Sequence, residues 1–474
     1  MATNEKARMK RTPLEVAVFS CLIGAAAAAE TTFEPRVTVS ETRASNITLA
    51  PRGAEESEWI TEAKPGFFLG RDGTRFDYTV DYDLQALFYL EDGDRNDVYH
   101  ALRGEGQGEV VQDRVFVDLD AGYDQRTIDP ANRQTRSNTF DAGNRTGVGT
   151  LRVSPWIKQP LVDIADATAR YTWSQVDYEK SDDPTVNIQN SDMNRVDLGL
   201  ASQDNFGWTW RMDYFAARIG YDDAADFEYE RAGAEVGIPV AASSHALFAA
   251  GRESNPDESR EGAGLDETWW TVGWQWAPTA RQNLEVRAGD RYYGNTYDLS
   301  WRRSGTRGAL VLDYHESPTT ASELEFDSFT VTPDGIFGQA RIDTRIFVRK
   351  RLSGLLTWTT SQSDWRLRLY REQRDYVSDA EADEEFLEDD EVYGIRAGWR
   401  WQAFSRTSLD TDALWEDQDF QEGEANGGRL SVALVRDLKS NLEGQLGAVR
   451  LFKNSEAIED YRDTSVFLAL TWYP

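Results

Sequence analysis

Acidic loops are the first segments of this 474-residue chain whose spacing could support chemistry. The segment Asp92–Asn96 starts with the Asp-x-Asp-x-Asn spacing of a calcium-binding loop. Such a loop would continue with a glycine and end with a glutamate, where this chain has Asp97 and Arg103. We therefore interpret this segment as a solvated hairpin loop. A second acidic run, within 377–390, is also expected to be a solvated loop, with binding of divalent cations that bridge lipopolysaccharide as the alternative.

Nucleophiles and metal ligands of the usual enzyme types are scarce in this sequence. The chain has one cysteine, Cys21, and three widely spaced histidines, His100, His245 and His315. It has no Gly-x-Ser-x-Gly motif, and its carboxylates are too abundant to single out a glycosidase pair. We therefore predict no catalytic residue, no metal site and no cofactor, and we expect the protein not to be an enzyme.

Two sets of charged residues at alternate positions are the strongest candidates for a binding surface. The basic set belongs to three neighbouring segments and comprises Arg345, Arg349, Arg351, Arg366, Arg368, Arg374, Arg396 and Arg400. The acidic set lies nearer the N-terminus and comprises Glu58, Glu62, Asp77, Asp81, Asp83, Asp118 and Asp120. Alternate residues of a strand point to one face of a sheet, so each set is expected to line one wall of a common interior.

The segment 75–90 shows most clearly the strand pattern that would position these charges. Its even positions, from Phe76 to Leu90, are apolar or aromatic, whereas the odd positions from Arg75 to Gln85 are charged or polar. The same alternation recurs at 206–216, 270–276, 284–292, 393–401 and 466–472. Soluble strands usually have about five or six residues, whereas a tilted membrane strand needs roughly 9–11. A large soluble β-sandwich or propeller is the alternative, but the chain lacks the blade repeat that a propeller requires.

Short turns alternate with longer polar connections along the chain. This alternation is typical of outer-membrane barrels, which have tight periplasmic turns and long extracellular loops. We therefore predict an all-β fold, a single transmembrane antiparallel β-barrel of about 22 strands, in the range of roughly 18–24. The first strand is expected near Arg36–Arg43 and the last near Asp463–Tyr473, with both termini periplasmic. The longest connection, Ser317–Asp343, is the one evident segment that could fold into the barrel and block its lumen.

Composition and charge exclude several other classes of protein. The net charge of −31 argues against nucleic-acid binding, which needs Lys and Arg to neutralise phosphates. The longest apolar run, Val16–Ala29, is shorter than the roughly 20 residues of a transmembrane helix. Because this run follows basic residues and ends in alanines, we predict a signal peptide over 1–29, cleaved near Ala29, and a barrel over 30–474. Acylation at Cys21, as in a lipoprotein, is the alternative.

Several short motifs carry a family resemblance. Glu55-Glu56-Ser57, Leu84-Gln85-Ala86, Tyr89-x-x-Asp92-x-Asp94-Arg95-Asn96-Asp97 and His100-x-Leu102 come first, and Ser317-Pro318-Thr319-Thr320 and Tyr370-Arg371-Glu372-x-Arg374-Asp375-Tyr376 follow. Together they resemble the PEP-CTERM-system-associated outer-membrane β-barrel family, most strongly over 37–103 and 345–376. The resemblance implies a barrel in an exopolysaccharide and exosortase context, and it implies no reaction. The ending Trp472-Tyr473-Pro474 departs from the terminal aromatic residue that the barrel-assembly machinery commonly reads.

These features together predict a porin-like conduit of the Gram-negative outer membrane, associated with extracellular polysaccharide export or biosynthesis. Its lumen would be charge-segregated, and its arginines would hold the carboxylates of uronate sugars. The alternative for the charged sets is internal pairing, with Asp410 and Asp412 neutralising the arginines. The alternatives for function are a glycan- or lipid-modifying enzyme and a scaffold barrel with a blocked lumen. Expected partners are outer-membrane lipid and lipopolysaccharide, the barrel-assembly machinery, the exopolysaccharide and export components, with no nucleic acid.

Overall fold

The computed structural model covers most of the chain after residue 30. It describes residues 31–474 except 130–131, 134–136, 141–142, 163, 180–187, 204–206, 223, 225, 256–264, 331–345, 377–388 and 421–422. The predicted signal peptide, residues 1–29, therefore lies outside the described residues. So do Arg345 and most of the acidic run within 377–390.

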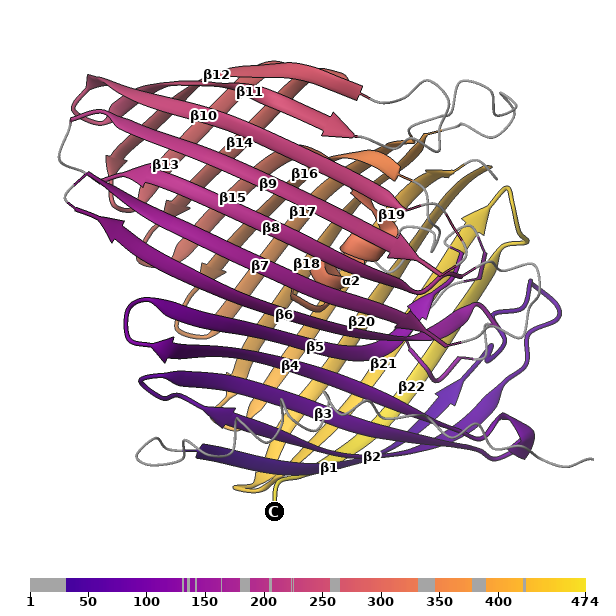
Figure 1. Ribbon diagram of the computed structural model, residues 1–474. Coiled ribbons are helices and arrows are strands. Elements are labelled where there is room, and N and C mark those ends of the chain that lie inside the picture. The colour runs from indigo at the N-terminus through magenta and orange to yellow at the C-terminus, as the bar shows by residue number, and fades with distance from the viewer. Residues whose placement is uncertain are drawn as a thin grey trace, which may run out of the picture.

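The described residues form one closed antiparallel β-barrel (Figure 1). Its 22 strands are β1 (Thr31–Ala44), β2 (Glu58–Arg71), β3 (Phe76–Tyr89), β4 (Asp97–Val111), β5 (Val115–Thr127), β6 (Arg145–Leu161), β7 (Ala165–Tyr178), β8 (Ser191–Ser202), β9 (Thr209–Tyr221), β10 (Phe227–Ala241), β11 (Ser244–Asn255), β12 (Leu265–Thr279), β13 (Gln282–Arg291), β14 (Gly294–Ser304), β15 (Gly308–Thr320), β16 (Ile346–Thr359), β17 (Ser363–Tyr376), β18 (Asp390–Phe404), β19 (Thr407–Phe420), β20 (Gly423–Lys439), β21 (Leu442–Ser455) and β22 (Tyr461–Trp472). Two short helices accompany them, η1 (Gly93–Arg95) and α2 (Ala321–Thr330).

Pairing of the first strand with the last closes the barrel. Strand β1 pairs with β2 on one side and with β22 on the other, with Val37 opposite Trp472 and Arg43 opposite Val466. The predicted fold class is therefore confirmed, including its strand number. Closure matters because it leaves no open sheet edge, which a membrane does not tolerate.

The two ends of the barrel differ in their connections. Even-numbered strands are followed by tight turns, such as 242–243 and 440–441, at what we call the short-turn end. Odd-numbered strands are followed at the opposite, long-loop end by longer connections such as 45–57, although 292–293 and 421–422 are short. Because β1 begins where β22 finishes, both ends of the described chain lie at the short-turn end.

The outer face of the barrel is apolar and aromatic. On β12, Trp270, Val272 and Trp274 are 51%, 45% and 42% exposed, and exposed apolar side chains alternate in the same way along β22. The intervening residues of these strands point inward, as the period of two predicts. An exposed apolar surface of this extent suits a lipid bilayer and not water. No helix among the described residues is long and apolar enough to cross a membrane.

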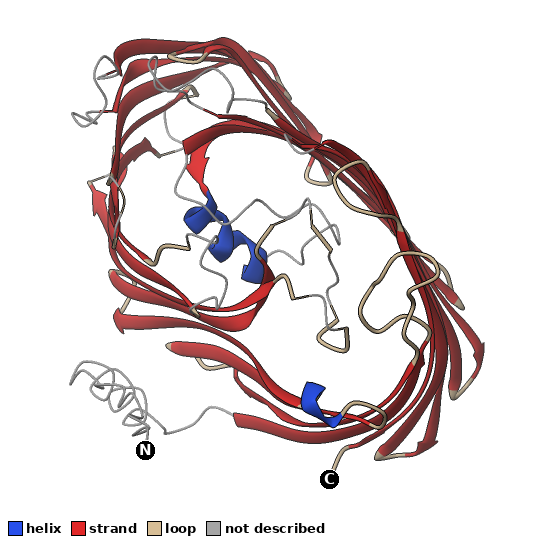
Figure 2. Ribbon diagram, turned by 90° about the vertical axis from the view of Figure 1, so that its right-hand side faces the viewer, coloured by secondary structure: helices blue, strands red, loops and turns tan. Residues whose placement is uncertain are grey.

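One hairpin leaves the wall and enters the lumen. Strand β14 pairs with β15 only as far as Leu299 opposite Tyr314, whereas β15 and β16 stay paired up to Thr320 opposite Ile346. Consecutive residues of this tip, Ile346, Phe347 and Val348, are all buried, so neither face of the strand meets solvent or lipid. Helix α2 continues from β15, and Figure 2 shows it inside the ring of strands. The segment predicted to block the lumen thus begins as strand and helix, and its residues 331–343 lie outside the described part.

The face assignment predicts opposite results for two neighbouring substitutions on β4. Leu102 pairs with the outward Tyr82, whereas Ala101 lies on the inner face opposite Asp83. Leu102→Arg should impair assembly, because an arginine facing lipid near mid-bilayer costs about 2–4 kcal/mol. Ala101→Arg should assemble normally, because its guanidinium meets water and a carboxylate. The folded fraction on unheated gels after refolding into lipid measures both, and equal behaviour of the two variants would contradict the assignment.

Candidate functional site

The predicted basic set lies on the inner face of β16, β17 and β18. Outward neighbours such as Trp365 and Leu369 are each 49% exposed, and the arginines at the intervening positions face the lumen. The strand register places Arg349 opposite Arg374 and Arg368 opposite Arg396. The structure therefore brings the described members of the set onto one continuous wall.

Glu372 neutralises the part of this wall nearer the long-loop end. Its carboxylate lies 2.8 Å from the Arg349 guanidinium, 2.7 Å from that of Arg374 and 3.6 Å from that of Arg351. The Arg374 side chain is only 1% exposed, and it also lies 3.8 Å from Asp390. A buried arginine needs such compensation, because desolvating a charge is costly. Sequence reasoning passed over Glu372, although its even position puts it on the face of its arginine partners.

The part of the wall nearer the short-turn end contains Asp410 and Asp412, which the sequence analysis gave as possible partners of the arginines. Arg396 Nε donates to Asp412 at 2.8 Å, and the Arg400 guanidinium lies 2.7 Å from Asp410. Arg400 is largely exposed to the lumen, so its pair is screened by water. Internal pairing therefore describes these two arginines.

Asp412 is nevertheless shared between two guanidinium groups. Besides Arg396, Arg429 on β20 lies 4.0 Å from the Asp412 carboxylate. The exposed Arg366 stands opposite Gly398, which in turn stands opposite Asp412. A Cβ on Gly398 would lie in ordinary contact with an Asp412 oxygen and with the Cβ and backbone oxygen of Arg366, so the small Gly398 stands between these two residues. We call Arg366, Arg396, Arg429 and Asp412 the basic cluster.

The predicted acidic set faces the lumen but is not purely acidic in its surroundings. Arg36 lies 2.5 Å from Asp81 and 2.8 Å from Asp83, and Arg170 lies 2.6 Å from Asp118. The remaining acidic residues, Glu58, Glu62, Asp77 and Asp120, lie on the inner faces of β2, β3 and β5, where Ser40 donates to Glu62 and the backbone N–H of Gly73 donates to Asp77. A charge that is partly removed from water needs an opposite charge nearby, and each wall contains such counter-charges. The charge segregation predicted from the sequence is therefore only partial.

A cavity of about 1800 Å³ occupies the lumen beside the acidic set. Its lining includes Asp77, Asp118 and Asp120, and none of the predicted basic set. Apart from Arg71 of β2, its arginines come from β6 to β13, a group that sequence reasoning did not select. Most belong to short-range pairs, such as Arg195 with Asp197 at 2.6 Å and Arg287 with Glu285 at 2.7 Å.

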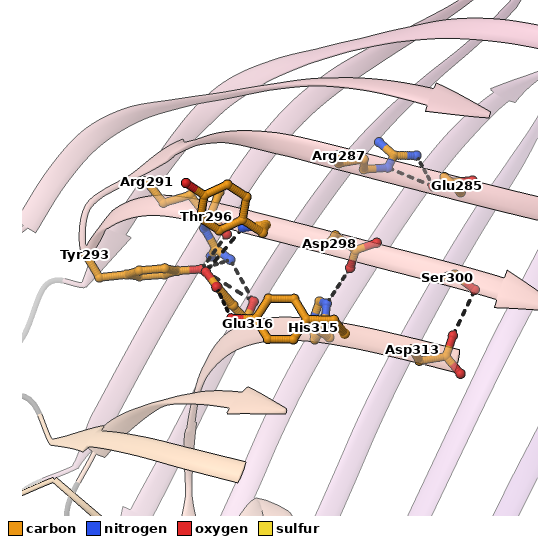
Figure 3. Close-up of polar contacts among 12 residues, drawn as sticks. Glu285, Arg287, Arg291, Tyr293, Thr296, Asp298, Ser300, Asp313, His315 and Glu316 are labelled. Atoms are coloured by element: carbon orange, nitrogen blue, oxygen red, sulfur yellow. Dashed lines mark hydrogen bonds and ion pairs between the residues drawn. The ribbon is translucent and has the colours of Figure 1, made fainter. Parts of the chain in front are cut away.

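Figure 3 shows the polar contacts along β13, β14 and β15. Arg287 meets Glu285 on β13, and His315 Nδ1 lies 2.8 Å from Asp298 on the facing strand. Near the long-loop end, the Arg291 guanidinium lies 2.9 Å from the Tyr293 hydroxyl. The buried Glu253 accepts from Arg291 at 2.8 Å and from the Tyr229 hydroxyl at 2.8 Å. This network ties the strands together where β15 leaves the wall.

Helix α2 closes one side of the cavity by docking on the far wall. Glu325 accepts from Arg126 Nε of β5 at 2.9 Å, and Phe326 lies 4.2 Å below the Arg152 guanidinium of β6. Phe326 also packs against Val148 and other buried residues of β6 and β7. Helix α2 follows β15, and the strands that it contacts lie about half of the barrel circumference away. The helix therefore crosses the lumen (Figure 2).

The described carboxylates form no metal site. No group of three or more His, Cys, Asp or Glu side chains in the described part is placed to hold a metal ion. In the calcium-like segment, Asp92 accepts from the backbone N–H of Asp94 and lies 3.2 Å from Arg95. Arg95 also lies 2.8 Å from Glu56, so this segment is a capped turn.

Comparison with known proteins finds likeness in fold. No protein-family model and no curated protein matches the sequence. Among solved structures, a double mutant of the ferric enterobactin receptor PfeA from Pseudomonas aeruginosa is 11% identical, with 94% of this chain and 81% of that chain covered and a TM-score of 0.49. The siderophore receptor PirA from Acinetobacter baumannii is 7% identical over 94% and 81% of the two chains, with a TM-score of 0.47. The FrpB iron transporter from Neisseria meningitidis is 8% identical over 94% and 83%, with a TM-score of 0.48. At these identities the likeness is one of fold alone.

The pairing in the basic wall predicts unequal effects of removing its carboxylates. Glu372→Gln removes the carboxylate that Arg349, Arg351 and the buried Arg374 share, and should lower the free energy of unfolding by about 3–5 kcal/mol. Asp410→Asn removes the partner of the exposed Arg400 and should lower the free energy of unfolding by at most about 1 kcal/mol. Urea unfolding in lipid vesicles measures both losses, and a Glu372→Gln variant as stable as Asp410→Asn would refute the pairing account.

Proposed function

We propose that the protein is an outer-membrane conduit for an acidic polysaccharide, held closed by the β15–β16 tip and α2. The observation that carries the proposal is the basic cluster, in which Arg396 and Arg429 share the carboxylate of Asp412, and Arg366 lies on the same inner face two strands away. A guanidinium binds a carboxylate through two parallel hydrogen bonds, so a uronate residue passing this place offsets the excess positive charge.

The position of α2 supports a closed resting state. A helix that crosses the lumen and contacts the far wall through Glu325 and Phe326 restricts passage, and its release would not require the wall to unfold. The same observation favours a second candidate, a scaffold barrel with a permanently blocked lumen. The two candidates differ in whether the unmodified protein passes an acidic saccharide at all.

An enzyme receives less support from the lumen. Two of its buried carboxylates, Glu253 and Glu372, are 1% and 6% exposed, and both accept hydrogen bonds from arginines. A general acid must carry and release a proton, which such guanidinium contacts oppose. These carboxylates therefore stabilise strand pairing and are poorly placed for proton transfer.

The proposed setting follows the sequence expectations. The short-turn end faces the periplasm, and the long-loop end faces the cell exterior. The hairpin that enters the lumen belongs to the long-loop end. A signal peptide cleaved near Ala29 would deliver the chain, the barrel-assembly machinery would insert it, and lipopolysaccharide would surround its outer leaflet. Exopolysaccharide and export components are the proposed functional partners.

Passage of charged sugars into liposomes tests the proposal. The double variant Glu325→Gln with Phe326→Ala removes the charge and the aromatic ring through which α2 contacts Arg126 and Arg152 of the far wall. We expect the wild-type barrel to admit oligogalacturonides slowly, and the double variant to admit them several times faster. Both should admit a neutral malto-oligosaccharide of equal length less well, because it gains nothing from the arginines.

The control for lost charge is Glu34→Gln, which removes one inward carboxylate at the short-turn end of β1 and leaves α2 untouched. It should behave as wild type. The conduit fails if wild-type barrels admit no oligogalacturonide, which is the scaffold outcome. It also fails if neutral and acidic sugars enter equally in every variant.

A further inference from the structure

Arg231 stands apart from other arginines of the lumen cavity. Arg170, Arg195 and Arg287 each lie within 3 Å of a carboxylate oxygen. Arg231 lines the same cavity from the half of β10 nearer the long-loop end, and within the described part of the chain its guanidinium has no hydrogen bond or ion pair. Its contact is instead with an aromatic ring, because its guanidinium carbon lies 4.0 Å from the centre of the Trp269 ring.

Trp269 is fixed as a flat support for this guanidinium. A Cβ on Gly233 of β10 would come within 2.3 Å of the indole, and one on Gly251 of β11 within 2.8 Å. The indole therefore lies against the inner wall in a place that two glycines leave free, and it is only 6% exposed. Stacking on an indole face orients a guanidinium and leaves its in-plane N–H donors available.

The carboxylate that faces Arg231 across the strands is already engaged by other donors. Glu253 lies opposite Arg231 in the register of β10 and β11, and it accepts hydrogen bonds from Arg291 and from the Tyr229 hydroxyl. Arg231 therefore adds a second positive charge to a carboxylate that is fully engaged. An anion entering the cavity would find a planar, oriented and uncommitted donor there.

We propose that Arg231, supported by Trp269, is a binding subsite for the carboxylate of an acidic sugar. The ligand class rests on the proposed function, and the site itself rests on the stacked guanidinium and the cavity. The carboxylate accepts two parallel hydrogen bonds from Arg231, and the sugar ring extends into the cavity, where Thr296 offers a hydroxyl group. This subsite lies on β10, outside the basic cluster of β17 to β20.

A local fluorescence titration tests the subsite. Cys21 is the only native cysteine, so Cys21→Ser with Thr271→Cys gives a single thiol beside the site for an environment-sensitive dye. The probe ligand is trigalacturonate, with maltotriose as the neutral comparison. We expect trigalacturonate to change the dye signal saturably, and Arg231→Gln to weaken its affinity about tenfold or more, since a hydrogen-bonded charge pair is lost. Arg231→Lys should give an intermediate loss, because it keeps the charge without the planar fork.

The matched control is Arg307→Gln, which removes one positive charge from the exposed turn between β14 and β15 at the short-turn end. It should bind like the parent. Gel mobility without heating verifies that each labelled variant is folded. The subsite is refuted if Arg231→Gln binds trigalacturonate as tightly as Arg307→Gln, if maltotriose binds equally well, or if the parent does not bind trigalacturonate.

The subsite and the conduit can fail separately. If oligogalacturonides enter liposomes while Arg231→Gln leaves binding unchanged, the subsite is wrong and the conduit stands. If Arg231→Gln abolishes binding while no oligogalacturonide crosses the wild-type barrel, the conduit is wrong and the subsite stands.

Discussion

Closure of a single sheet on itself in a bilayer imposes the constraint on which every other feature depends. The outward positions of all the strands must be apolar, so the charges of a highly charged chain are confined to the lumen and the two ends. Inside that confined space charges of one sign cannot be gathered without counter-charges. The pairs of Arg36 with Asp81, Arg170 with Asp118 and Arg396 with Asp412 are the local solutions.

Against this paired background, the exceptions carry the functional argument. In the basic cluster, one carboxylate serves several arginines, and on β10 a single arginine is held by an indole and has no carboxylate partner in the described part. The second place lines a cavity that a ligand can enter. The inward hairpin and α2 add a third element, because α2 lies inside the lumen and contacts the far wall through Glu325 and Phe326.

The period of two made much of the fold predictable. Strand type, face and number follow from alternation such as Phe76 to Leu90, because a one-residue slip would expose charges to lipid. The Arg396 and Arg400 pairs were foreseeable from the same pattern. The inward turn of β15 was not, because Ile346–Val348 is apolar on both faces and such a run does not reveal whether lipid or protein covers it. The Arg231 subsite was also hidden, because it depends on register across β10, β11 and β12, which no local spacing specifies.

The central claim is that the hairpin tip and α2 close a charged lumen, and single-channel conductance tests it most directly. Thr320 and Ile346 face each other in register, so a two-residue Asn-Gly turn can join them in place of residues 321–345. In planar bilayers the account predicts that this shortened barrel conducts several times more current than the wild-type protein at the same voltage and salt. Equal conductance of two correctly folded barrels would contradict it.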